Sequence, residues 1–182
     1  MTPILVLDDL EDVQSPAPND GDVLTYDDVA GLWKPTAAPP AGYDEGARVY
    51  HSLDIDTLHN TWTYISYNSE RYDTDLIHDN VTNNSRLTCK TAGIYIIVAQ
   101  ISWDLHATGT RQTQIRLNRA VALAQYRMEA FATEYPNYTM ATIYKLAVND
   151  YIEVLVRQTS GVTLKVLTGA QYSPEFMMQR IG

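Results

Sequence analysis

The sequence is poor in cysteine and in long apolar runs, and each shortage excludes a class of protein. A single cysteine, Cys89, allows no internal disulfide and no multi-cysteine zinc site. Its neighbours are typical of a strand, and we expect Cys89 to be a small buried side chain. No stretch approaches the roughly 20 apolar residues that span a bilayer, so we expect no membrane insertion. The start of the chain lacks the basic and apolar segments of a signal peptide.

Basic residues are scarce in the first quarter of the chain. The 182 residues carry a formal net charge of −9. Residues 1–46 hold ten acidic residues and one basic residue, whereas residues 47–182 hold twelve of each, so the first segment accounts for the whole excess. A protein that binds nucleic acid through bulk charge has the opposite balance. We therefore expect no nucleic-acid partner.

The first segment has too few apolar residues for a core of its own. Asp20-Gly21 is a turn signal, and residues 22–26 and 32–34 are strand candidates around a second turn at residues 28–31. Such an element needs a partner surface, or copies of itself, to become ordered. The proline-rich stretch 35–42 predicts an extended linker. We divide the chain into an arm with its linker, residues 1–46, and a domain, residues 47–182.

Residues 47–182 show a hydrophobic period of two. Residues 93–103 are nearly continuously apolar, as in a strand covered on both faces, and residues 151–157 place apolar side chains on one face. Residues 120–132 are the stretch whose alanines would also suit a helix. With the turns between them, about ten short strands predict an all-β antiparallel sandwich or jelly roll. The expected strands are residues 47–53, 62–67, 85–89, 93–103, 112–117, 120–127, 138–147, 151–157, 162–167 and 171–179.

No sequence motif marks a catalytic centre or a phosphate site, so we expect no enzyme activity and no cofactor. The best polar cluster is residues 72–80, in which Asp73, Asp75 and Asp79 offer hard oxygen ligands for Ca²⁺. The spacing lacks the glycine and the final glutamate of an EF-hand loop. A solvated loop with Asx turns is the commoner structure for such a run, and both interpretations stay open.

Several segments, taken in order, resemble the C1q/TNF-like domain family. They are an aromatic strand that leads to Asn and a Tyr-Asp loop (residues 62–75), a short strand (residues 85–88), a Gly-hydrophobic-Tyr opening of a long strand (residues 92–97), a late hairpin (residues 146–154) and a closing strand (residues 172–178). The resemblance spans residues 48–181. The sequence departs from animal members in having no collagenous Gly-X-Y stalk, and the glycine-phenylalanine signature near the closing strand is altered.

The details are closest to the bacteriophage and bacterial branch of that family. Residues 68–79 resemble that branch, and residues 8–13, 18–26 and 31–35 are similar to a short module of phage fibre and other virion proteins. The resemblance implies a ten-strand jelly roll that assembles as a homotrimer and serves display and adhesion, not catalysis. For this chain it implies a bacteriophage virion structural protein of the capsid decoration or head-fibre type, made in the host cytoplasm and placed on the virion surface.

In this interpretation residues 1–46 attach the protein to a capsid or tail protein of the virion. The domain projects outward as a trimeric knob that binds a host-surface glycan or protein. The predicted attachment residues are Leu10, Val13, Val23, Leu24, Tyr26, Leu32 and Trp33. The predicted trimer-interface residues are Tyr95, Ile97, Tyr144 and Tyr151.

Three other functions stay open at this point. The protein could be a tail-associated receptor-binding protein, or a secreted or spore-surface glycan-binding module of a bacterium. The third is a polysaccharide-cleaving enzyme, because spacing alone does not exclude a pair of catalytic carboxylates.

Overall fold

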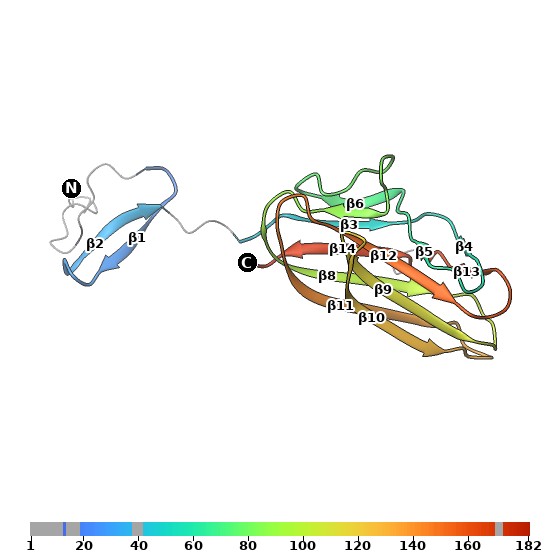
Figure 1. The fold of residues 1–182 in the computed structure, drawn as a ribbon. Coiled ribbons are helices and arrows are strands. Elements are labelled where there is room, and N and C mark those ends of the chain that lie inside the picture. Colours follow the sequence, from blue (N-terminus) through green and yellow to red (C-terminus); the bar gives the residue numbers. More distant parts are fainter. Residues whose placement is uncertain (1–12, 14–18, 38–41, 170–172) are drawn as a thin grey trace, which may run out of the picture. The chain divides into compact units, whose positions relative to one another are not determined.

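The computed structural model describes residue 13 and residues 19–37, 42–169 and 173–182, and these residues form fourteen strands (Figure 1). Within these ranges no helix is long and apolar enough to cross a membrane. The chain forms two compact units, Met1–Gly42 and Tyr43–Gly182.

The second unit begins at Tyr43 and not at residue 47, because the residues before β3 (Gly46–Tyr50) contact the end of the chain. Arg180 Nη1 donates to Glu45 Oε1 over 2.8 Å, and the Arg180 guanidinium lies 4.5 Å from the centre of the Tyr43 ring. The Arg180 backbone N–H also donates to the Glu45 carbonyl oxygen over 2.8 Å. Residues 43–45 therefore belong structurally to the domain.

The first unit contains one antiparallel hairpin, β1 (Asp22–Asp27) and β2 (Leu32–Ala37). The turn between the strands is stabilised by Asp27. Its carbonyl oxygen accepts the Gly31 N–H over 2.8 Å, and Gly31 has a φ of 67°, which favours glycine. The hydrogen bond from Lys34 holds the pKa of the Asp27 carboxyl below its usual range. The hairpin predicted from the sequence is present.

The second unit is a sandwich of two five-stranded antiparallel sheets and a two-stranded ribbon. The first sheet has the order β10-β9-β12-β5, and β7 also pairs with β12; the second has the order β11-β8-β14-β3-β6. Figure 1 shows β9, β10 and β12 on one layer and β3, β8 and β14 on the other. The strands of the first sheet are β5 (Thr63–Tyr64), β7 (Arg86–Thr88), β9 (Thr110–Leu117), β10 (Val121–Glu129) and β12 (Tyr151–Gln158). Those of the second are β3 (Gly46–Tyr50), β6 (Ser69–Asp73), β8 (Gly93–Ser102), β11 (Asn137–Leu146) and β14 (Glu175–Arg180), and the ribbon is β4 (Ile55–Thr57) with β13 (Leu164–Val166).

The core lies between the two sheets and follows the period of two. On β12 the residues Ile152, Val154 and Val156 are fully buried. On β8 alternate residues from Tyr95 to Ile101 are buried in the same core, while Ile94 is exposed on the other side. The expectation that β8 is covered on both faces is therefore wrong for the single chain, and the sheet has an apolar outer face.

The alanine-containing stretch after residue 120 is a strand and not a helix. β10 pairs with β9 along its whole length, from Val121 opposite Leu117 to Glu129 opposite Thr110. A bulge between Ala122 and Ala124 shifts the register. Pairing with β9 thus overrides the helical preference of the alanines.

Cys89 is buried, as the sequence predicted, and its Sγ donates to the Thr91 carbonyl oxygen. Burial raises the pKa of the Cys89 thiol. A buried thiol with a raised pKa is a poor nucleophile. The side chain is therefore structural.

Two of the four predicted trimer-interface residues are wrong. Tyr95 and Ile97 are fully buried in the core of their own chain, and the Tyr95 hydroxyl donates to the Thr91 carbonyl oxygen over 2.6 Å. Tyr144 lies on β11 opposite Tyr95, whereas Tyr151 lies on β12 in the other sheet. The four side chains therefore do not share a surface. The prediction failed because the sequence pattern gives the alternation along β8 but not which of its two faces the chain itself covers.

Candidate functional site

The outer face of the second sheet carries a cluster of apolar side chains, which we call the apolar face; Lys145, opposite Ile94, and Gln179, opposite Ile96, are the polar residues beside them. Ile143 on β11 lies opposite Ile96 on β8, and Ala141 lies opposite Val98. Val98 also lies opposite Met177 on β14. The apolar face comprises Ile94, Ile96, Val98, Ala141, Ile143, Met177 and Ile181.

Four isoleucines of the apolar face are exposed to solvent in the single chain. Their exposed fractions are 41% for Ile94, 36% for Ile96, 59% for Ile143 and 47% for Ile181. Isolated exposed aliphatic residues are common, but a group of them on β8, on β11 and just after β14 marks an interaction surface. The apolar face is therefore a candidate protein–protein interface.

The buried carboxylate of Glu175 lies at one end of the apolar face. Glu175 precedes Met177 on the same side of β14 and is fully buried, because Arg48 and Arg71 cover it. Each arginine Nε donates to one carboxylate oxygen over 2.6 Å, and the Arg71 guanidinium lies 4.6 Å from the centre of the Tyr50 ring. Both carboxylate oxygens accept charge-assisted hydrogen bonds, so the group is held in one orientation.

The outer face of the other sheet is basic, and we call it the arginine face. It comprises Trp62, Tyr64, Arg86, Gln114, Arg116, Arg119, Gln125, Arg127, Tyr151, Glu153 and Arg157. Three of its guanidinium groups lie over aromatic rings. Arg86 is 4.0 Å from the centre of the Tyr151 ring, Arg119 is 4.5 Å from that of Tyr64, and Arg157 is 5.9 Å from that of Trp62.

Glu153 lies fully buried beneath two of these arginines. Its carboxylate accepts hydrogen bonds from Ser85 Oγ over 2.8 Å, from Arg119 Nε over 2.9 Å and from Arg86 Nε over 3.3 Å. The same contact raises the pKa of the Arg119 guanidinium. Glu153 therefore fixes the position of both cations on the arginine face.

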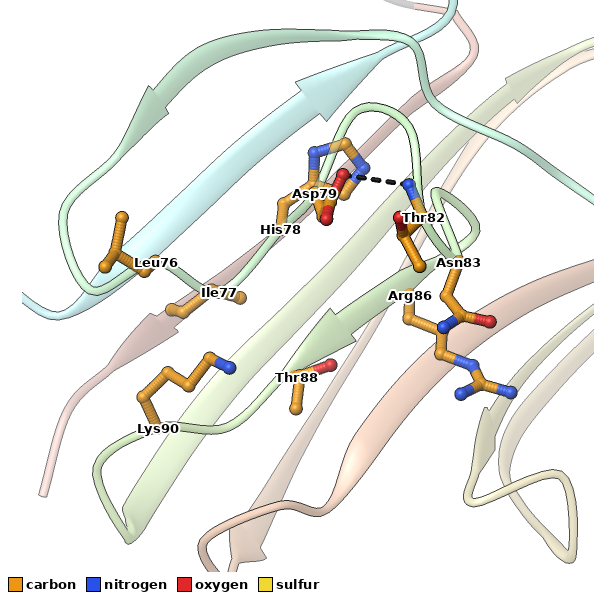
Figure 2. Close-up of a pocket in the computed structure, with 9 residues that line it drawn as sticks. All are labelled: Leu76, Ile77, His78, Asp79, Thr82, Asn83, Arg86, Thr88 and Lys90. Atoms are coloured by element: carbon orange, nitrogen blue, oxygen red, sulfur yellow. Dashed lines mark hydrogen bonds between the residues drawn. The ribbon is translucent and has the colours of Figure 1, made fainter.

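A pocket of about 390 Å³ opens beside β7, next to the arginine face (Figure 2). Arg86, Thr88 and Lys90 line it on the β7 side, and the segment from Leu76 to Asn83 lines the other. In Figure 2 the Lys90 ammonium points toward Thr88, between β7 and the strand-free segment that carries Leu76 and Ile77. Two cationic side chains thus border a polar hollow.

Two of the three aspartates considered as calcium ligands, Asp73 and Asp79, accept hydrogen bonds from the backbone of their own loop. The Asp73 carboxylate accepts the backbone N–H groups of Ile77 and His78, both over 2.9 Å. The Asp79 carboxylate accepts those of Val81 and Thr82, and these bonds lower its pKa. In the part of the chain that the structure describes, no group of three or more His, Cys, Asp or Glu residues is arranged to hold a metal ion. The structure does not bring Asp75 together with the other two as ligands.

Removal of divalent cations is expected to leave the melting temperature unchanged. Asp73 satisfies backbone donors without an ion, so Asp73→Ala should lower the free energy of unfolding by about 1–2 kcal/mol in the presence and in the absence of EDTA. Scanning calorimetry of both proteins with Ca²⁺ or EDTA measures this. A drop in the melting temperature of the wild type on chelation would reinstate the calcium site.

The predicted attachment residues of the arm present apolar surface on the hairpin. The exposed fractions are 41% for Val23, 39% for Leu24, 52% for Tyr26 and 40% for Trp33. The Tyr26 and Trp33 rings pack with their centres 5.4 Å apart. Leu32 is partly buried, Val13 forms an isolated bridge with Trp33, and Leu10 lies outside the described residues. The hairpin thus offers apolar side chains to a partner, in an acidic segment.

The sequence did not reveal the arginine face. Each of its stacked pairs joins residues far apart in the chain, such as Arg86 with Tyr151 and Arg119 with Tyr64. The available signal was that the tyrosines concentrate in the domain, with eleven of thirteen after residue 46. That signal suggested a partly wet interface but did not say which arginines meet which rings.

No protein-family model and no curated protein matches the sequence. Among solved structures the chain is similar to Eiger TNF of S. frugiperda, with a TM-score of 0.55 and 15% identity over 78% of this chain and 94% of that one. It is similar to murine APRIL at pH 8.0, with a TM-score of 0.57 and 12% identity over 74% and 97% of the two chains. For the globular domain of the zebrafish complement 1qA protein the values are 0.54, 12%, 76% and 98%. The predicted fold class is confirmed, because the chain has the jelly-roll fold of the TNF and C1q domains.

Proposed function

We propose that the chain is a non-enzymatic structural protein of a bacteriophage virion. Residues 43–182 assemble as a homotrimer that is displayed on the particle, and the acidic arm attaches it to a capsid protein. The sequence resemblance to the phage branch and to the fibre module supports the virion role. The observation that carries the proposal is the apolar face, which the single chain leaves in water.

Burial of the apolar face is the physical reason for self-association. Removing one exposed isoleucine side chain from water contributes about 1.5–3 kcal/mol when burial is complete, and each copy presents four of them. A closed ring lets every copy bury this face against its neighbours. Little net charge opposes this packing, because residues 43–182 hold fourteen acidic and twelve basic residues.

The arms of the three subunits attach the trimer to the virion by combining three weak contacts. One hairpin offers few apolar side chains, so a single arm binds weakly. Three arms held by one trimer engage a symmetric acceptor together, and the effective concentration of the second and third arm raises the overall affinity. An acceptor that complements the arm presents lysine or arginine around an apolar groove.

Light scattering on the purified full chain tests the assembly. The expected mass is about three times the 20.5 kDa of one chain at micromolar concentration. Mass spectrometry of purified particles from the phage that encodes the chain tests the location, and the chain should be present in a multiple of three copies. A monomeric chain, or particles that lack it, would contradict the proposal.

A further inference from the structure

We propose that the arginine face binds an acidic polysaccharide through its carboxylate groups. The inference deepens the adhesive role in the proposed function, since it names the surface and the chemistry of the ligand. It concerns the sheet β10-β9-β12 with β5 and β7, which is the sheet opposite the apolar face. Trimer formation through the apolar face leaves this sheet outward.

The strand register places the basic residues on one side of the sheet. Glu153 on β12 lies opposite Arg116 on β9 and opposite Arg86 on β7. Arg157 lies opposite Gln112, which in turn lies opposite Arg127 on β10. The residues between them, such as Ile152, Val154 and Val156, point into the core. Arg86 and Arg116, on either side of Glu153, and Arg157 and Arg127, on either side of Gln112, therefore lie on the same outer face of the sheet.

The face has a clear excess of positive charge. It holds five arginines and one glutamate, Glu153, with Glu129 and Asp150 at its two ends. Among the described residues Arg116, Arg127 and Arg157 form no ion pair. The electrostatic complement of this surface is an anionic ligand. The basic face contrasts with the net charge of the whole chain, which is −9.

Three guanidinium groups of the face, those of Arg86, Arg119 and Arg157, are held in place before any ligand arrives. Stacking on a ring restricts a guanidinium to one plane while its N–H groups still point sideways. Arg86 and Arg119 are restricted further by Glu153. Ordering these long side chains on binding would otherwise cost affinity, so a pre-ordered set binds carboxylates more tightly.

The pocket in Figure 2 extends the same surface past the sheet edge. Arg86 belongs both to the arginine face and to the pocket, and Thr88 lies opposite Tyr151 on β12. Lys90 adds a second cation there, and Thr82 adds a hydroxyl group. The Asp79 carboxylate also lines the pocket, where its charge is partly offset by the backbone N–H groups of Val81 and Thr82. One acidic sugar residue fits the chemistry of this hollow, and the chain of the polysaccharide continues over Tyr151 and Tyr64.

The polar character of the face favours a glycan over a peptide or a nucleic acid. Gln114 and Gln125, hydrogen-bonded to each other over 2.6 Å, lie between the two pairs of arginines and match the hydroxyl groups of sugars. Leu155, the aliphatic residue of β12 on this side, is 2% exposed, so no apolar pocket receives a peptide side chain. The rings of Tyr64 and Tyr151 are covered by guanidinium groups, which leaves less aromatic surface for stacked bases.

Calorimetric titration of the full chain with oligogalacturonate tests the inference. The variant Arg127→Gln/Arg157→Gln removes two cations of the face that form no ion pair. Lys34→Gln/Lys165→Gln removes two cations elsewhere, which pair with Asp27 and Asp56, and is the control for the change in net charge. We expect binding by the wild type, a loss of affinity of about tenfold or more in the first variant and of less than about twofold in the control.

Lys90→Gln should lower the affinity by about threefold, because it removes one cation of the pocket.

The neutral methyl ester of the same oligosaccharide and oligothymidylate are titrated in parallel. Equal binding of the ester, an equal loss in both double variants, tighter binding of oligothymidylate, or no binding at all would each overturn the inference. Light scattering on the same samples separates the two proposals. A trimer that does not bind refutes only the polysaccharide site, whereas a monomer that binds refutes only the assembly.

Discussion

Replacing Ile143 with glutamate is expected to convert the trimer into a monomer. Ile143 is 59% exposed and lies in the centre of the apolar face, opposite Ile96. The substitution costs the folded single chain little, because the side chain contacts mainly water there. In the trimer it removes about 1–2 kcal/mol of burial per copy, because only the exposed part of the side chain remains to be buried, and it places a carboxylate in an apolar contact. Three copies together weaken the assembly by at least about 3 kcal/mol, which is more than about 100-fold.

Sedimentation velocity measures the outcome, and circular dichroism shows whether the variant is folded. Val162→Glu is the matched control, because Val162 is 51% exposed and lies in the loop before β13. Ile94→Glu, at the end of the same face, provides a second variant with the same expected result. A folded Ile143→Glu trimer as stable as the wild type would show that subunits meet through another surface.

The fold could be predicted because the sheet pattern is local. Alternate apolar residues on β8 and β12, and glycine or asparagine at the turns, specify strands without knowledge of their partners. Gly21 and Gly31 have positive φ values at turns that the sequence indicates. The pattern also showed that β8 is apolar on both faces. It did not show that the chain itself leaves one of these faces uncovered. A strand covered on both faces within one chain, as in a parallel sheet, has the same apolar composition.

The candidate sites depend on pairing between distant strands and were harder to predict. Tyr95 was assigned to the subunit interface from its residue type, but its position on β8 places it in the core, and Ile94 is the residue that faces outward. A shift of one residue along a strand exchanges the two faces. The same limit applies to Glu153, whose partners Arg86 and Arg119 come from two other segments.

Deleting residues 1–42 is expected to leave a folded trimer that no longer joins the virion. The cut follows Gly42 because Tyr43 and Glu45 contact Arg180 at the end of the chain. The truncated protein should keep the melting temperature of the full domain and lose incorporation completely, since the hairpin that carries Tyr26 and Trp33 is gone. Electrophoresis of purified particles, with the truncated protein supplied in place of the full chain, measures incorporation.

A slightly longer deletion tests the boundary itself. Removing residues 1–46 also takes away the Glu45–Arg180 pair and the Gly46 N–H that donates to Thr74 Oγ1 over 2.9 Å. This protein should melt at a lower temperature than the one that begins at Tyr43, by about 2–4 °C if the lost contacts contribute roughly 1 kcal/mol. In the full chain, Trp33→Ala should reduce incorporation with no change in trimer mass, because Trp33 is 40% exposed on the hairpin. Normal incorporation of the protein that begins at Tyr43 would place the attachment site in the domain.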